Sequence, residues 1–186
     1  MPHDHVCPWW MAYTFDNPLR RLVHNPAKMF GDYVGLGGRA ADIGCGMGYF
    51  TLGLARLVGD GGRVYALDLQ QKMLNRVRSR AERSGLDRCV DTRLVGRADL
   101  GADDLAGSLE LVLNFWMLHE VPDQAGFLAQ VKNLLKPDGV LFIAEPLMHV
   151  TAKEFDDSLE LAAGLGLRLL DRPKVRMARA AVLKAG

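Results

Sequence analysis

Short apolar runs alternate with amphipathic segments along most of the chain. The runs have the length of strands that are buried on both faces of a parallel sheet, whereas the segments between them repeat apolar residues at helical spacing. This alternation predicts a doubly wound α/β domain. Strands are predicted at 39–43, 63–69, 90–95, 109–115 and 140–144, with two weaker candidates at 167–173 and 177–184.

Several helix ends carry their own signals. An apolar stripe over 127–135 predicts a helix, and the "KPDG" that follows at 136–139 is expected to end it. Thr151 with Glu154 forms a capping box that opens a later helix. Asn25 stands before a proline, as an N-cap residue does when proline occupies the first helical turn.

The turn after the first strand reads "DIGCGMG", residues 42–48. Glycine removes the side chain that would hold a ligand away from the backbone, and it permits positive φ. The helix start that follows is expected to offer free N–H groups and a partial positive charge. Asp68 ends the next strand, where a carboxylate accepts hydrogen bonds from both ribose hydroxyls. Tyr49 stands where the dinucleotide fingerprint needs glycine, which disfavours a nicotinamide oxidoreductase.

Four segments, "ADIGCGMGYF", "VYALDL", "LHEVPD" and "LLKPDGVLFIAEP", resemble class I S-adenosylmethionine-dependent methyltransferases, especially the small ubiquinone/menaquinone C-methyltransferase-like group. The resemblance covers roughly residues 30–185. It implies a seven-stranded mixed sheet in the order 3-2-1-4-5-7-6 with strand 7 antiparallel. It also implies S-adenosyl-L-methionine as the cofactor and S-adenosyl-L-homocysteine as its product.

The resemblance assigns the cofactor to residues at the ends of the strands. The residues that it places around the methionine portion are Asp42, Gly44, Cys45 and Gly46. Asp68 is expected to bind the ribose, and Leu69 to lie against the adenine. The backbone of Asn114 is expected to face the amino acid portion.

The adenine amino group is assigned less directly. Many relatives carry an acidic or amide residue after the third strand, but Arg97 stands there in this chain. Two alternatives remain: Asp99 substitutes for the missing residue, or the backbone around Ala98 makes the contact. Tyr13 is a further candidate for the cofactor side.

The stretch "NFWMLHEVPD", residues 114–123, follows the fourth strand, where the methyl acceptor is expected. His119 titrates near neutral pH and is a candidate for removing a proton from the acceptor. Glu120 is expected to orient His119 or to bind a cation. The alternative is that His119 is structural. Relatives that take large acceptors usually carry an inserted lid or an extra helix after the fifth strand, but few residues separate that strand from the next helix here. The resemblance therefore implies a small acceptor or one that protrudes from an open site.

The first 30 residues are interpreted as an aromatic, helical lid segment, and residues 31–186 as the cofactor-binding methyltransferase domain. The aromatic side chains of the lid candidate are Trp9, Trp10, Tyr13 and Phe15. Such rings attract a sulfonium cation and cover apolar acceptors. The alternatives are that they pack a terminal helix on the sheet or form a dimer contact.

Composition and charge exclude some classes of function but do not identify one. The net charge of +1 argues against strong nucleic-acid steering, and no apolar run approaches the ~18 residues of a membrane helix. The N-terminus lacks a signal-peptide pattern, so a cytoplasmic location is expected. Three cysteines without CxxC spacing indicate neither a disulfide framework nor a metal site.

The sequence therefore predicts an S-adenosylmethionine-dependent methyltransferase that transfers methyl by direct displacement to a small-molecule acceptor, with no nucleic-acid or membrane partner. A non-catalytic S-adenosylmethionine- or S-adenosylhomocysteine-binding protein, or a subunit of a larger methyltransferase complex, is the alternative. The oligomeric state is left open, with a homodimer as one possibility.

Overall fold

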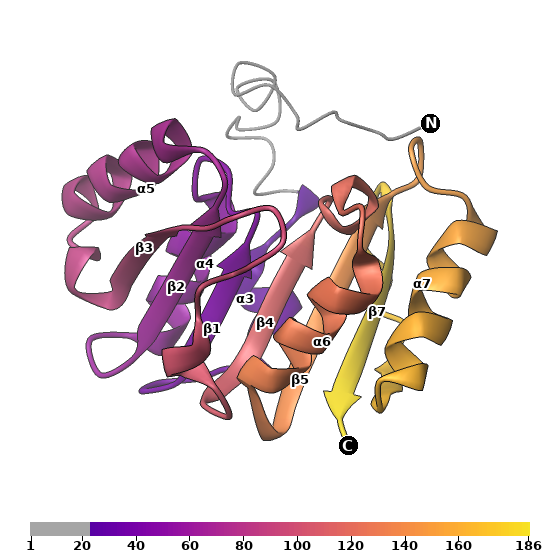
Figure 1. Cartoon of the computed structure of the whole chain (residues 1–186). Coiled ribbons are helices and arrows are strands. Elements are labelled where there is room, and N and C mark those ends of the chain that lie inside the picture. Colours follow the sequence, from indigo (N-terminus) through magenta and orange to yellow (C-terminus); the bar gives the residue numbers. More distant parts are fainter. Residues whose placement is uncertain (1–22) are drawn as a thin grey trace. The chain divides into compact units, whose positions relative to one another are not determined.

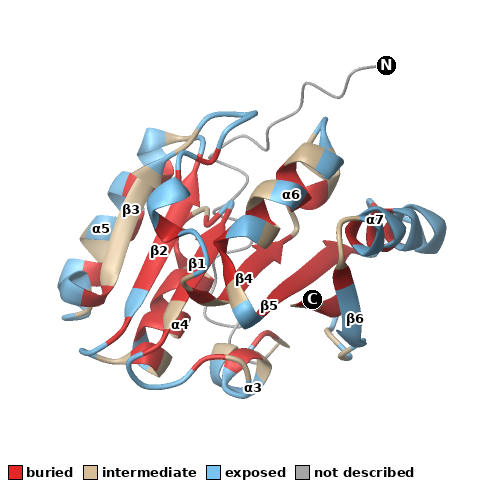
Figure 2. Ribbon diagram, turned by 60° about the horizontal axis from the view of Figure 1, so that its bottom comes forward, coloured by how far each residue is buried: buried red, intermediate tan, exposed pale blue. Residues whose placement is uncertain are grey.

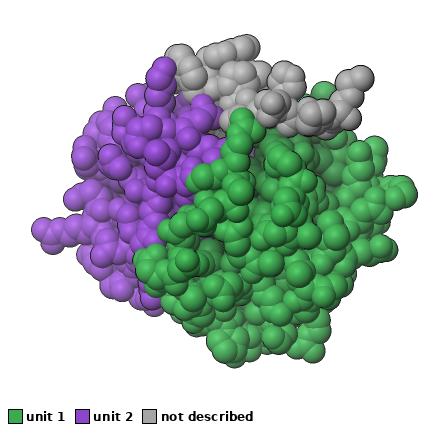
Figure 3. Space-filling view, viewed as in Figure 1, with its two compact units in different colours: residues 1–5, 96–186 green, residues 6–95 purple. Residues whose placement is uncertain are grey.

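The structure, a computed structural model, describes residues 23–186. Its seven strands form one mixed sheet in the order β3-β2-β1-β4-β5-β7-β6 (Figure 1). The strand order and the antiparallel β7 confirm the fold that the sequence predicted. Within the described residues the chain divides into two compact units, 23–95 and 96–186 (Figure 3).

The unit of residues 23–95 holds three strands of the sheet. Its elements are α3 (Pro26–Phe30), β1 (Arg39–Ile43), α4 (Tyr49–Val58), β2 (Arg63–Asp68), α5 (Gln71–Arg83), the 3-10 turn η1 (Asp87–Cys89) and β3 (Val90–Leu94). β2 pairs in parallel with β1 on one side and with β3 on the other. The carboxyl ends of these three strands therefore share one edge of the sheet, the edge at which such folds bind ligands.

The unit of residues 96–186 holds the other four strands. Its elements are η2 (Asp103–Leu105), β4 (Leu109–Phe115), η3 (Leu118–Glu120), α6 (Gln124–Leu134), β5 (Leu135–Pro146), α7 (Ala152–Gly164), β6 (Leu167–Asp171) and β7 (Ala178–Ala185). β4 and β5 are parallel, and β7 runs antiparallel to both β5 and β6.

The central strands are buried on both faces, as their unbroken apolar runs predict (Figure 2). Leu111, Val112 and Leu113 of β4 are fully buried although neighbouring side chains of a strand point to opposite faces. Among residues 23–186, no helix is both long enough and apolar enough to cross a membrane.

The capping signals are confirmed. The Asn25 side chain accepts hydrogen bonds from two N–H groups of α3, and Thr151 and Glu154 form the capping box of α7. The predicted role of "KPDG" is wrong in detail, because α6 ends at Leu134 and β5 begins at Leu135. Its residues lie inside β5, where the register against β4 shifts between Leu109 and Leu111. The extra residues of β5 form an irregular, bulged start to that strand.

A buried polar pair joins β1 to α4. The hydroxyl of Thr51 donates a hydrogen bond of 2.6 Å to Oδ2 of Asp42. Asp42 is 2% exposed and Thr51 is fully buried, so water cannot replace this bond. A hydrogen bond to a charged group contributes more to the free energy of folding than a bond between neutral groups. The loss of such a bond from a buried carboxylate is therefore strongly destabilising.

We expect Thr51→Val, which is close to isosteric, to lower the free energy of unfolding by about 2 kcal/mol. The reason is that the buried Asp42 carboxylate loses the hydrogen bond from the Thr51 hydroxyl. Urea denaturation checks this. Thr92→Val is the matched control, because the Thr92 hydroxyl contacts Arg78 in an exposed position. Equal stability of Thr51→Val and the wild type would contradict the assigned role.

Candidate active site

The glycine turn after β1 is held against the end of β2. The N–H groups of Gly44 and Cys45 both donate to the carbonyl of Leu67, at 2.8 and 3.1 Å. The N–H of Gly46 donates to Oδ2 of Asp68 at 3.0 Å. Protein acceptors at the end of β2 therefore already bind the N–H groups of these three residues. The free N–H groups expected at the start of the following helix stay a prediction.

Two glycines of the turn are required for different reasons. Gly46 has φ of 52°, and a Cβ built there would meet no atom of residues 23–186 within 4 Å. Gly48 has φ of 80°, and a Cβ there would lie 2.9 Å from a methyl group of Val77 on α5. Gly48 is thus explained by helix packing, whereas Gly46 leaves the backbone bare toward open space. Gly46 is the position where a ligand could approach the turn closely.

Asp68 ends β2 and is 7% exposed. Its Oδ1 accepts a hydrogen bond of 2.8 Å from the N–H of Gln70, while Oδ2 binds the turn. Burial raises the pKa of this carboxyl, and the backbone donors of Gln70, Gly46 and Leu69 only partly oppose the rise. Leu69 follows with 38% of its surface exposed, which places an apolar side chain beside the carboxylate.

Two other predicted cofactor residues point into the interior. The carboxylate of Asp42 is buried and bonded to Thr51. The side chain of Cys45 packs in a buried cluster with Ala66, Leu74 and Val77. Burial, followed by the nearby charges of Asp42 and Asp68, raises the pKa of the Cys45 thiol well above its usual range. Contact of either side chain with a cofactor stays a prediction.

The two alternatives for the adenine contact both lie on the surface of the 96–186 unit. The carbonyl of Ala98 accepts a hydrogen bond of 2.9 Å from Nε2 of Gln130 on α6. The carboxylate of Asp99 accepts one of 2.8 Å from the N–H of Gly101. Both residues are exposed, and the choice between them stays open. Tyr13 and the aromatic segment around it lie outside the described residues.

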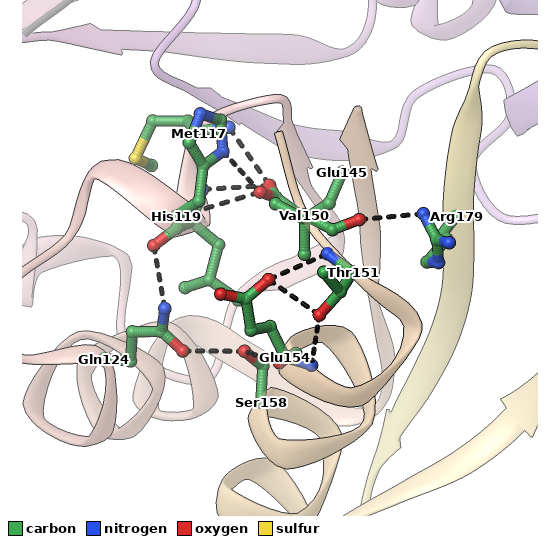
Figure 4. A network of polar contacts seen from close by, with 10 residues as sticks. Met117, His119, Gln124, Glu145, Val150, Thr151, Glu154, Ser158 and Arg179 are labelled. Atoms are coloured by element: carbon green, nitrogen blue, oxygen red, sulfur yellow. Dashed lines mark hydrogen bonds and ion pairs between the residues drawn. The ribbon is translucent and has the colours of Figure 1, made fainter. Parts of the chain in front are cut away.

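A network of polar contacts surrounds Glu145, near the end of β5 (Figure 4). Its Oε1 accepts hydrogen bonds from the N–H groups of Met117 and Leu118, at 3.2 and 3.0 Å. Its Oε2 accepts one from the N–H of His119 at 3.2 Å and lies 2.5 Å from Nδ1 of the His119 ring. Glu145 is 1% exposed, so four donors replace the water that its charge has lost.

Glu145 fixes the protonation pattern of His119. Because Nδ1 faces a carboxylate, the proton of the neutral ring belongs on Nδ1, and Nε2 carries the lone pair. Burial lowers the pKa of His119, but the hydrogen bond to Glu145 and the charges of Glu145 and Glu120 outweigh it, and the pKa is raised. The side chain remains 26% exposed, and its ring lies 5.9 Å from the ring of His149.

The carboxylate that contacts the His119 ring is thus Glu145, 26 residues away in sequence. Orientation of the ring by the adjacent Glu120 stays a prediction. Glu120 contributes charge to the raised pKa of the ring. The sequence signal for Glu145 was an acid at the end of a predicted buried strand, beside the strand that leads to His119. Across residues 23–186, no group of three or more His, Cys, Asp or Glu side chains is arranged to hold a metal ion.

Comparison with known proteins gives the family. The family described as "Methyltransferase domain" matches residues 41–143, more than half of the chain. The ubiquinone biosynthesis O-methyltransferase of Xanthomonas axonopodis pv. citri (strain 306) is 36% identical over 141 residues, which are 73% of this chain and 55% of that protein. The protein of the same name from Xanthomonas euvesicatoria pv. vesicatoria (strain 85-10) is 35% identical over the same shares. The chain therefore spans about half the length of these relatives.

Solved structures agree on the fold. A SAM-dependent methyltransferase from Aquifex aeolicus superposes with a TM-score of 0.86 at 20% identity, over 97% of this chain and all of that one. The methyltransferase in a complex with the Haloferax volcanii Trm112 activator gives 0.75 at 16% identity, over 95% of each chain. This chain belongs to the class I S-adenosylmethionine-dependent methyltransferase family. The family and these neighbours indicate S-adenosyl-L-methionine as its cofactor.

We expect Gly46→Ala to weaken binding of S-adenosyl-L-homocysteine by about tenfold or more, because a methyl group would occupy the open side of the turn. It should also cost about 1 kcal/mol of stability through its positive φ. Gly107→Ala is the matched control, since Gly107 has φ of 62° and also faces open space. Isothermal titration calorimetry of both variants checks this. Equal affinities of the two variants would remove Gly46 from the binding surface.

Proposed function

We propose that this chain is an S-adenosylmethionine-dependent methyltransferase that methylates a hydroxyl group of a small-molecule acceptor, with His119 as the general base. The observation that carries the proposal is the hydrogen bond between the His119 ring and the buried Glu145. A histidine oriented by a carboxylate is a common arrangement for accepting a proton from a hydroxyl.

The residues of the 23–95 unit fit the cofactor. The absence of a side chain at Gly46 permits close approach, and the position of the Asp68 carboxylate at the end of β2 supports its assignment to the ribose. The half-exposed Leu69 offers an apolar surface for the base. We assign these three residues to the donor, together with the predicted backbone contacts of the turn at Gly44 and Cys45. When bound, S-adenosyl-L-methionine supplies a methyl group already activated by its positive sulfur.

His119 serves the acceptor. A hydroxyl must lose its proton as its oxygen bonds to the methyl carbon. Nε2 of His119 carries the lone pair that accepts this proton. The carboxylate of Glu145 then stabilises the imidazolium, and the nearby charge of Glu120 adds to this stabilisation. A phenol, with a pKa of about 10, gives up its proton to such a base far more readily than an aliphatic alcohol does. A phenolic or enolic hydroxyl is therefore the acceptor that fits His119 best.

The names of the relatives support oxygen as the atom that is methylated, since both Xanthomonas proteins are O-methyltransferases of ubiquinone biosynthesis. The second candidate is a cofactor-binding subunit that acts only with a partner. It is favoured by the Haloferax volcanii neighbour, which was solved in complex with a methyltransferase activator.

A screen with methyl-labelled S-adenosyl-L-methionine tests the proposal. Small phenols and enols should accept label, and matched thiols and amines should accept little. Calorimetry with S-adenosyl-L-homocysteine accompanies the screen. Tight cofactor binding without transfer to any hydroxyl would contradict the proposal and favour the subunit alternative.

We expect kcat/KM for methyl transfer to rise with pH through the pKa of His119, because only the neutral ring accepts a proton. That pKa lies above its ordinary 6.5 in the wild type. Glu145→Gln should move the rise to lower pH, because it removes the charge that raises the pKa. It should also lower the plateau by about 10²-fold, because the oriented base contributes on that order. The pH–rate profile measures both effects.

Glu160→Gln, an exposed substitution on α7, is the control and should leave the profile unchanged. Circular dichroism of the Glu145→Gln protein shows whether it is folded, so that a loss of activity through unfolding can be recognised. A folded Glu145→Gln protein with the wild-type profile would show that His119 does not act as the base.

A further inference from the structure

The end of β4 carries a buried side-chain amide that has no hydrogen-bond partner within the described part of the chain. Asn114 is fully buried, and neither Oδ1 nor Nδ2 of its side chain has a hydrogen-bond partner among the described residues. An unpaired buried polar group costs free energy, so folded proteins rarely keep one without a reason. Here both the acceptor and the donor of the same amide are unpaired.

The register of the strands places this amide on the face that carries Glu145. Asn114 of β4 pairs with Ile143 of β5, and paired residues of neighbouring strands present their side chains to the same face. Glu145 lies two residues beyond Ile143, so its side chain returns to that face. The amide of Asn114 and the carboxylate that holds His119 therefore share one face of the sheet, near the carboxyl ends of β4 and β5.

The backbone just beyond Asn114 is strained. Trp116 has φ of 61°, a conformation that a bulky residue adopts only when its surroundings impose it. Its N–H donates to the carbonyl of Ala144 at 2.7 Å, which ties this conformation to β5. Strained residues and unpaired polar groups cluster where a structure is shaped for a ligand and not for its own stability.

We propose that the carboxamide of Asn114 binds the methyl acceptor through a group that both donates and accepts hydrogen bonds, namely a hydroxyl. This inference rests on the proposed function, since it takes the acceptor to be the hydroxyl compound that His119 deprotonates. The hydroxyl oxygen accepts a hydrogen bond from Nδ2 of Asn114, which leaves the hydroxyl hydrogen available to Nε2 of His119. Asn114 is thus a specificity-determining residue that selects hydroxyl-bearing acceptors over apolar compounds of the same shape.

The test compares two probes of nearly equal size, phenol and toluene, on the protein saturated with S-adenosyl-L-homocysteine. Competition by ligand-observed NMR measures their affinities. The wild type should prefer phenol by about tenfold, because one good hydrogen bond is worth that ratio. Asn114→Leu should abolish the preference, and Asn114→Val provides a second, smaller replacement if leucine overfills the site. Asn133→Leu, at an exposed position on α6, is the control and should keep the preference.

Stability gives an independent readout. Without any ligand, Asn114→Leu should melt about 3 °C above the wild type, because it removes an unpaired buried amide. A lower melting temperature for both Asn114 variants would show that the amide supports the fold, and would overturn the proposal. An absent phenol preference in the wild type, or its persistence in both variants, would also overturn it. The binding test needs no methyl transfer, so it separates this inference from a failure of the proposed reaction.

Discussion

Glu145 concentrates the chemistry of the 96–186 unit in one buried charge. Three consecutive backbone N–H groups, from Met117 to His119, converge on its carboxylate, and the ring of His119 completes the set. At 1% exposure these donors replace the hydrogen bonds that the carboxylate would otherwise make with water. The shape of η3 and the orientation of the His119 ring are consequently two results of the same interaction. A change at Glu145 is therefore expected to move the ring that we propose as the base.

The 23–95 unit uses the same device at the end of β2. Asp68 binds the N–H of Gly46 in the glycine turn and the N–H of Gln70 at the start of α5. In each unit a buried carboxylate at a strand end binds the loop beside it, and that loop carries the backbone or side chain that we assign to a ligand. Burial raises the pKa of Asp68, because removing the carboxylate from water disfavours its charged form.

The sequence predicted the fold well because its signals are local. Apolar runs located β1 and β4 to the residue, and Asn25 and Thr151 showed where two helices begin. The start of β5 escaped prediction because its bulge depends on pairing with β4, which no local pattern records. The candidate site shows the same difference between local motifs, which could be predicted, and contacts between elements, which could not. Its glycine turn was visible as a motif, but the contact of Glu145 with His119 joins residues on different elements. Nor could the sequence show that Val77 leaves no room for a side chain at Gly48. It also could not show that the amide of Asn114 lacks a hydrogen-bond partner among the described residues.

The account depends most on the state of one imidazole ring, and nitrogen-15 NMR of the histidine side chains reads that state directly. A pH titration of the protein, with a His119→Gln variant to assign the signal, reports both the tautomer and the pKa. We predict that neutral His119 carries its proton on Nδ1 and titrates above 6.5. A proton on Nε2, or a pKa below 6.5, would contradict the role assigned to Glu145 and with it the proposed base.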